Sequence, residues 1–167
     1  MAGGVPLNGQ QLFNLLDNEF LMKAYFKQIF KHEHWANLKV LESMISASEI
    51  PQRVVEIFSH TIATQRIWLD RINGAKTELK VWEVFETNIM LELLEINYND
   101  INKIIDSQDF EQLIAYQNSS GQYFTSTINQ ILSHLALHAS YHRGQVVLLL
   151  KSHVDALPTT DYIFYVR

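Results

Sequence analysis

The stretch that decides the fold is residues 14–45, NLLDNEFLMKAYFKQIFKHEHWANLKVLESMI. Its apolar residues recur every three or four positions, and neither glycine nor proline interrupts it. This spacing is typical of an amphipathic helix, because side chains three and four positions apart share one helical face. The stretch therefore predicts one long first helix with an apolar side for other helices to cover.

A second helix is predicted downstream by the same periodicity and by its end signals. Pro51 suits the first turn, because its missing N–H is not needed there. Asn73-Gly74 ends the helix, since Gly74 is free to adopt a left-handed conformation. A third helix is predicted over residues 85–106.

The last third of the chain mixes strand and helix signals. Residues 110–116 and 122–124, on either side of the turn Asn118–Gly121, predict two short strands that must lean on the helices. Thr127 and Gln130 have capping-box spacing and place the start of a fourth helix. The aromatic tail after it is expected to pack back. We therefore predict an all-α fold, a four-helix bundle with a short β-hairpin before the last helix, in a single domain over residues 1–167.

Charge and composition exclude several classes of function. The 167 residues carry a net charge of -5 with no Lys/Arg cluster, so we expect neither a nucleic-acid nor a membrane partner. The absence of cysteine excludes disulfides, thiolate ligands and a cysteine nucleophile, and it fits a reducing compartment. The first residues show no secretory signal, and the longest aliphatic run, Val146–Leu150, is too short to span a bilayer. We expect a cytoplasmic protein.

Three of the seven histidines, His134, His138 and His142, are spaced by four on the predicted fourth helix. Successive members rotate by only about 40° around the helix axis, so they share one side. His142 falls within the apolar stripe and His138 at its edge, whereas His134 lies further out. Such a pair can bind one metal ion, or it can consist of one core histidine and one surface histidine, and the spacing leaves both open. The predicted apolar stripe consists of Ile128, Ile131, Leu135, Ala139, Val146 and Leu149.

A metal site needs a third ligand from another helix. His60 is the best candidate, because it is the other histidine that lies well inside a helix facing the bundle. His32 and His34 are two positions apart and so point to different sides, which is typical of surface or aromatic packing. The Glu-x-x-His spacing of di-iron bundles and the glutamate of the zinc-protease motif are both absent.

The fourth-helix segment resembles a known motif. Residues 134–145, HLALHASYHRGQ, are similar to the last-helix motif of the DinB/YfiT-like family, in which His-x-x-x-His-Arg-Gly-Gln is the specific element. Other segments match the family in order, so the resemblance covers nearly the whole chain. These segments are His34–Asn37, Phe58–His60, Trp68–Ile72, Tyr116–Gly121, and Pro158 with Asp161.

The resemblance implies a bundle of up-down-down-up topology, frequently dimeric, with a divalent metal bound by three histidines. By position these ligands are His60, His138 and His142. Some branches of the family are transferases or isomerases that use low-molecular-weight thiols. We therefore expect a metal-dependent, thiol-dependent transferase or a hydrolase, acting on a small molecule as a homodimer. The metal is one divalent ion (Zn, Ni or Fe), and any thiol must be exogenous. The alternative is a non-enzymatic, dimeric metal-binding protein of stress response or sensing.

Three neighbours of these ligands have two interpretations each. His134 is either an acid/base group or a surface histidine. Arg143 either binds an anionic substrate group or makes a surface ion pair, and the ion pair is favoured. Glu56, one turn before His60, either orients that ring or lies on a solvated face.

Overall fold

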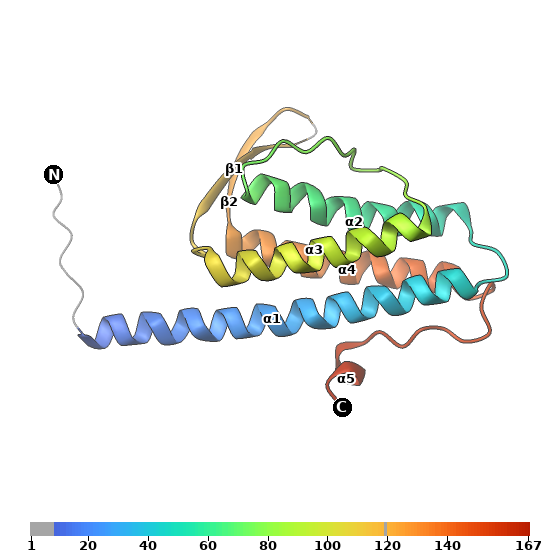
Figure 1. The fold of residues 1–167 in the computed structure, drawn as a ribbon, viewed down its shortest axis with the longest axis horizontal. Coiled ribbons are helices and arrows are strands. Elements are labelled where there is room, and N and C mark those ends of the chain that lie inside the picture. The colour runs from blue at the N-terminus through green and yellow to red at the C-terminus, as the bar shows by residue number, and fades with distance from the viewer. Residues whose placement is uncertain (1–8, 119) are drawn as a thin grey trace.

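The protein is described here by a computed structural model, which covers residues 9–118 and 120–167, with side chains from Asn18 onward. Residues 1–8, in which we expect no secretory signal, and Ser119 of the predicted turn lie outside this part. The fold is mostly helical with one small antiparallel hairpin, as expected for an all-α protein (Figure 1). Its elements are α1 (Gly9–Ser46), α2 (Gln52–Ile72), α3 (Thr87–Ser107), β1 (Leu113–Gln117), β2 (Tyr123–Thr127), α4 (Ile128–Leu150) and α5 (Tyr162–Tyr165).

The four long helices lie side by side, and each contacts two others. α1 and α2 both pack against α3 and α4. In Figure 1 the colour gradient shows that α2 and α3 run in one direction and α1 and α4 in the other. Because α2 and α3 are consecutive and run the same way, residues 73–86 return along the length of α2 before α3 begins. This return segment, residues 73–86, passes over the functional site described below.

The local end signals mostly act as predicted. Gly74 has a φ of +66°, in the left-handed region, at the end of α2. Pro51 lies one position before α2 rather than inside its first turn, because its ψ of 136° is extended. The capping box of α4 is complete, since Gln130 N–H donates to Thr127 Oγ1 and Thr127 N–H donates to Gln130 Oε1. α3 begins later than predicted, because Phe85 N–H donates to Ser59 Oγ and stays outside the helix.

The interior consists of two apolar clusters separated by a polar layer. One cluster lies beside the hairpin and includes Phe30, Leu69, Ile105 and Leu135, and the other lies at the far end. Along each long helix, polar residues stand between the positions that enter the two clusters. Each of these residues is at most 5% exposed, so the layer is nearly as buried as the core around it. The polar layer consists of Glu33, Asn37, Gln65, Asn97 and Arg143.

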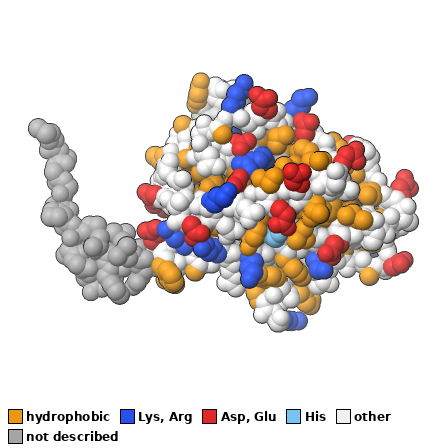
Figure 2. Space-filling view, in the orientation of Figure 1, with side chains coloured by type: hydrophobic (Ala, Val, Ile, Leu, Met, Phe, Trp, Pro, Cys, Tyr) orange, Lys and Arg blue, Asp and Glu red, His pale blue; other side chains and the backbone are white. Residues whose placement is uncertain are grey.

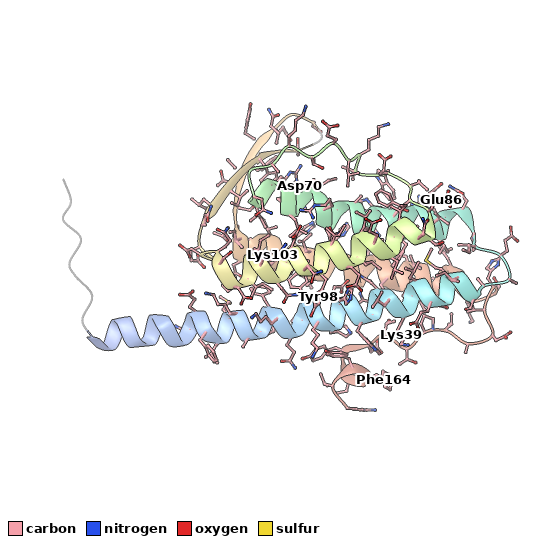
Figure 3. The ribbon with its side chains drawn as sticks, in the orientation of Figure 1. Lys39, Asp70, Glu86, Tyr98, Lys103 and Phe164 are labelled. Atoms are coloured by element: carbon pink, nitrogen blue, oxygen red, sulfur yellow. The ribbon has the colours of Figure 1, made fainter. Side chains whose placement is uncertain are left out.

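The two histidines near the middle of α1 point to different sides, as their spacing predicts. His34 of α1 stacks on Tyr98 of α3, with ring centroids 4.3 Å apart. Tyr98 is labelled in Figure 3. His32 turns toward the C-terminal tail, where its Nε2–H donates to the Thr160 carbonyl oxygen at 2.9 Å. Its ring also contacts Tyr162 edge to face. The tail therefore packs back on α1, as expected.

The surface has no charge patch of one sign on the face shown in Figure 2, where acidic, basic and hydrophobic side chains are interspersed. Across residues 9–118 and 120–167, we find no helix that combines the length and the apolar character needed to span a membrane.

Candidate metal centre

Two neighbouring helices bring three histidines to one point. His60 comes from α2, and His138 and His142 come from successive turns of α4, which packs against α2. One nitrogen of each ring lies within 4.8 Å of the others, and the Nε2 atoms of His60 and His138 are 3.2 Å apart. His60 is buried and the other two are partly buried. The structure therefore assembles the three side chains that the sequence singled out as candidate metal ligands.

The return segment fixes the orientation of His60. Nδ1 of His60 lies 2.8 Å from the carbonyl oxygen of Val81, which can only accept, so Nδ1 carries the proton. The neighbouring Trp82 stacks on the imidazole, with ring centroids 4.0 Å apart and an interplanar angle of 13°. Because Nδ1–H is bound to the backbone, Nε2 presents its lone pair to His138 and His142.

His142 is held in the same way by its own helix. Its Nδ1 lies 2.9 Å from Oε1 of Gln145, one turn further along α4. With Nδ1–H donating to the amide oxygen, the lone pair of His142 is on Nε2. Hydrogen bonds of this kind orient the imidazole ligands of metal sites and set the ligating nitrogen.

The donor set fits a divalent metal ion. Two imidazole nitrogens bound at 2.0–2.1 Å to a tetrahedral zinc ion lie about 3.3 Å apart. The separation of 3.2 Å between the Nε2 atoms of His60 and His138 is close to that value. Two ring nitrogens at this distance need a proton or a cation between them, because their lone pairs otherwise repel.

The surroundings favour the neutral form of His138 and of His60. Burial, followed by the charges of His142, His60 and His134, lowers the pKa of His138 to about 3. Burial is also the main cause of the lowered pKa of His60, although its hydrogen bond to Val81 acts in the opposite direction. Metal ions bind the neutral form of imidazole, so the lowered pKa values of His138 and His60 favour the form that can act as a ligand.

His134 lies beside the cluster but is not one of its three members. Its side chain is exposed, with a ring centroid 5.3 Å from that of His138, and it contacts Trp68 edge to face. It borders a groove of about 200 Å³ between the hairpin and the helices. The groove is also lined by Trp68, Tyr116, Ser126, Gln130 and Ile131.

The structure decides between the two interpretations of Glu56. Glu56 accepts a hydrogen bond from Arg53 at 3.0 Å on the solvated face of α2. His60 is instead oriented by the carbonyl of Val81, because the return segment passes directly over it.

The expected surface ion pair of Arg143 is wrong in its location. Arg143 is 5% exposed and pairs with Glu33 at 2.8 Å inside the protein. The buried face of α4 extends to Arg143 and Leu150, whereas Leu149, which the predicted stripe included, is 38% exposed. The buried face of α4 is therefore rotated away from the histidines relative to the predicted stripe.

Three supporting residues were missed by sequence reasoning. Gln145 is the last residue of the quoted motif and received no role, although its i, i+3 spacing from His142 is a usable signal. Val81 and Trp82 have no such signal, because they are brought to His60 by a loop of irregular structure.

Comparisons with known proteins agree with this picture. The family model described as the DinB family matches residues 28–167, a range that contains all three clustered histidines. The chain is also similar to "Protein DinB" of Bacillus subtilis (strain 168), with 26% identity over 170 residues, which covers 86% of this chain and 95% of that protein. No solved structure matches the chain.

Proposed function

Because this chain belongs to the DinB family, we propose that it is a metal-binding protein in which His60, His138 and His142 hold one divalent ion. The observation that carries the proposal is that one nitrogen from each of three imidazole rings lies at the same point. In His60 and His142 the other ring nitrogen, Nδ1, is hydrogen-bonded to a protein oxygen away from that point. Zinc, nickel and iron(II) all suit imidazole ligands. The donor set therefore points to a transition metal rather than to magnesium or calcium, which prefer oxygen.

The activity we propose is that of a metal-dependent enzyme acting on a small molecule, either a transferase that uses an exogenous thiol or a hydrolase. Three histidines leave a coordination position open, where a bound ion activates water or a thiol. The chain has no cysteine, so a thiol must come from a second substrate. We propose that the substrate lies in the groove beside the cluster and that His134, which lines this groove, exchanges a proton with it.

We also infer the larger arrangement around this site. The packing and directions of the long helices support a four-helix bundle of up-down-down-up topology in a single domain. The exposed apolar side chains Phe20 and Leu21 on α1, 72% and 63% exposed, support a homodimer formed by helix surfaces. The mixed surface charge and the lack of cysteine support a cytoplasmic protein without a nucleic-acid or membrane partner.

Metal content tests the site directly. Elemental analysis of the purified protein should give about one divalent ion per chain. His138→Ala and His142→Ala should lose most of it, because each variant removes one of three ligands. His153→Ala is the matched control, since it removes a histidine that lies outside the cluster. Full metal retention in both ligand variants would overturn the assignment.

Activity is tested by a screen of electrophile conjugation with several low-molecular-weight thiols, together with ester and amide hydrolysis. Activity of the wild-type protein should vanish on chelation, return with a divalent ion and be absent in His142→Ala. Equal rates for the wild-type protein and His142→Ala would show that the metal does not take part in catalysis. A full metal complement without any turnover would instead favour the binding or sensing function.

A further inference from the structure

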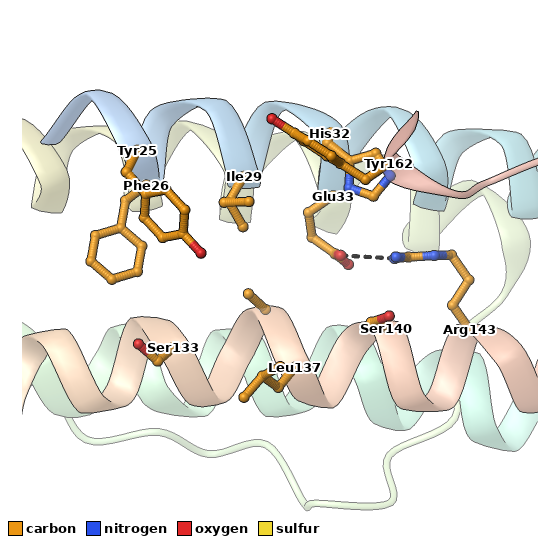
Figure 4. Close-up of a pocket in the computed structure, with 11 residues that line it drawn as sticks. Tyr25, Phe26, Ile29, His32, Glu33, Ser133, Leu137, Ser140, Arg143 and Tyr162 are labelled. Atoms are coloured by element: carbon orange, nitrogen blue, oxygen red, sulfur yellow. Dashed lines mark hydrogen bonds and ion pairs between the residues drawn. The ribbon is translucent and has the colours of Figure 1, made fainter. Parts of the chain in front are cut away.

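A second cavity, of about 320 Å³, lies between α1 and α4 (Figure 4). Ser133, Leu137 and Ser140 line it from α4, on the opposite side of that helix from His138 and His142. It is therefore separate from the candidate metal centre. Its volume lies within the range of small-molecule sites in proteins.

The walls of this cavity are apolar and one end is polar. Phe26, Ile29 and Leu137 are among the apolar side chains that line it. At the polar end Glu33 from α1 and Arg143 from α4 point toward each other, as the dashed line in Figure 4 shows. Tyr162 of α5 stands at the rim.

Arg143 has hydrogen-bonding capacity that its protein partners do not use. Within the described part of the chain, its hydrogen bonds all leave from Nη1, to Glu33 Oε2 at 2.8 Å and to Asn37 Oδ1 at 3.3 Å. The three N–H donors on Nε and Nη2 remain. Arg143 is only 5% exposed and lines this cavity, so we infer that these remaining donors face it.

The charge of Arg143 is already balanced. Glu33 accepts from Arg143 through Oε2 and from Asn37 Nδ2 through Oε1, so its carboxylate is satisfied and neutralises the guanidinium. A second anion in the cavity would carry an uncompensated charge into a poorly solvated place, which is costly. The free donors therefore favour an uncharged acceptor such as a carbonyl oxygen.

We propose that this cavity is a second ligand site, which binds an uncharged small molecule through an apolar body and a carbonyl oxygen that accepts hydrogen bonds from Arg143. The body lies against Phe26, Ile29 and Leu137. The tail partly covers it, because His32 holds the Thr160 carbonyl and so keeps Tyr162 at the rim.

The first test is a fluorescence titration with prodan, an uncharged naphthalene ketone whose emission shifts to the blue in apolar surroundings. Wild-type protein should bind it saturably with a blue shift. Ser140→Phe places a ring at the cavity wall and should weaken binding at least tenfold, and it should fold because Ser140 is exposed. Leu148→Phe, on an exposed part of α4 outside the cavity, is the matched control and should bind as wild type. Equal binding by Ser140→Phe and wild type would overturn the site.

The second test isolates the carbonyl by displacing prodan with 2-acetylnaphthalene and with its hydrocarbon analogue 2-isopropylnaphthalene. The double variant Glu33→Met/Arg143→Met should lose about tenfold of the preference for the ketone over the hydrocarbon that wild type shows. The double variant removes both charges together, so it avoids an unpaired buried ion. An unchanged ratio, or tighter binding of wild type to 2-naphthoate than to 2-acetylnaphthalene, would overturn the ligand class.

Two further measurements separate this site from the other surfaces of the protein. Prodan binding should be unaffected in His142→Ala, and its loss there would place the dye at the histidine cluster instead. Light scattering during the titration shows whether a second copy covers the cavity. Prodan binding that disappears as protein concentration and dimer fraction rise would show that the cavity between α1 and α4 is a dimer interface, and it would overturn the proposal.

Discussion

Replacing Gln145 by leucine should weaken metal binding without disturbing the fold. Gln145 Oε1 accepts the Nδ1–H of His142 at 2.9 Å, and leucine has a similar size but no acceptor. Without this bond the His142 ring can rotate, and its proton can move to Nε2, which is the nitrogen turned toward His60 and His138. Loss of such a supporting partner typically lowers metal affinity ten- to hundredfold.

The structure places the effect of Gln145→Leu near the lower end of that range. One hydrogen bond contributes about 1 kcal/mol net, and loss of the preferred tautomer adds to it. Gln145 is partly exposed, so water can replace part of the lost bond. We therefore expect about a tenfold loss of affinity, which corresponds to about 1.4 kcal/mol.

The assay is competition for Zn²⁺ between the metal-free protein and a chromophoric chelator of known affinity. Gln145→Glu is the matched variant, because it keeps an oxygen acceptor at this position and should bind at least as tightly as wild type. Thermal melts of the metal-free proteins check that the fold is unchanged. A Gln145→Leu protein that folds normally and binds Zn²⁺ within twofold of wild type would refute the reasoning.

Three further predictions concern stability. Arg143→Met should lower the free energy of unfolding by about 3 kcal/mol, because it leaves the buried Glu33 carboxylate unpaired. In urea denaturation the double variant Glu33→Met/Arg143→Met should recover most of this loss. A double variant that loses as much stability as the two single variants together would contradict the prediction. The metal-free protein should lose stability as pH falls from about 6.5 toward 3. Burial and the neighbouring imidazoles lower the pKa of His138 to about 3, so over this range the unfolded chain binds a proton that the folded chain does not. His138 alone should contribute a slope of at most about 1.4 kcal/mol per pH unit, and His138→Gln should remove this contribution in melts recorded across that range. Thr127→Ala should cost about 1 kcal/mol in thermal melts, because it removes the capping box of α4, and a change below about 0.3 kcal/mol would show that the box contributes little.

Local patterns in the sequence determined the features that depend on neighbours along the chain. The apolar periodicity of residues 14–45 predicted α1, which is continuous, and the spacing of Thr127 and Gln130 predicted the start of α4. The spacing of His138 and His142 likewise determined that both rings lie on one side of α4. In each case the interacting groups are separated by only a few residues, so helix geometry alone relates them.

The tertiary structure decided everything that depends on segments distant in the chain. The helical pattern only suggested His60 as the best third ligand, and the family resemblance then assigned it by position. Its hydrogen bond to Val81 exists because α2 and α3 run in the same direction, which forces residues 73–86 back across α2. For the same reason the true partner of His60 is a backbone carbonyl rather than Glu56, one turn away.

The buried pair of Arg143 and Glu33 shows most clearly what the tertiary structure decided and the sequence did not. Arg143 lies beside a candidate ligand in sequence, and a charged residue at such a place is more often solvated. Its burial depends on how far α4 is rotated about its own axis when it packs against α1 and α2. That rotation brings Arg143 to the carboxylate of Glu33, which α1 supplies across the interior, and the spacing of residues within α4 does not contain this partner.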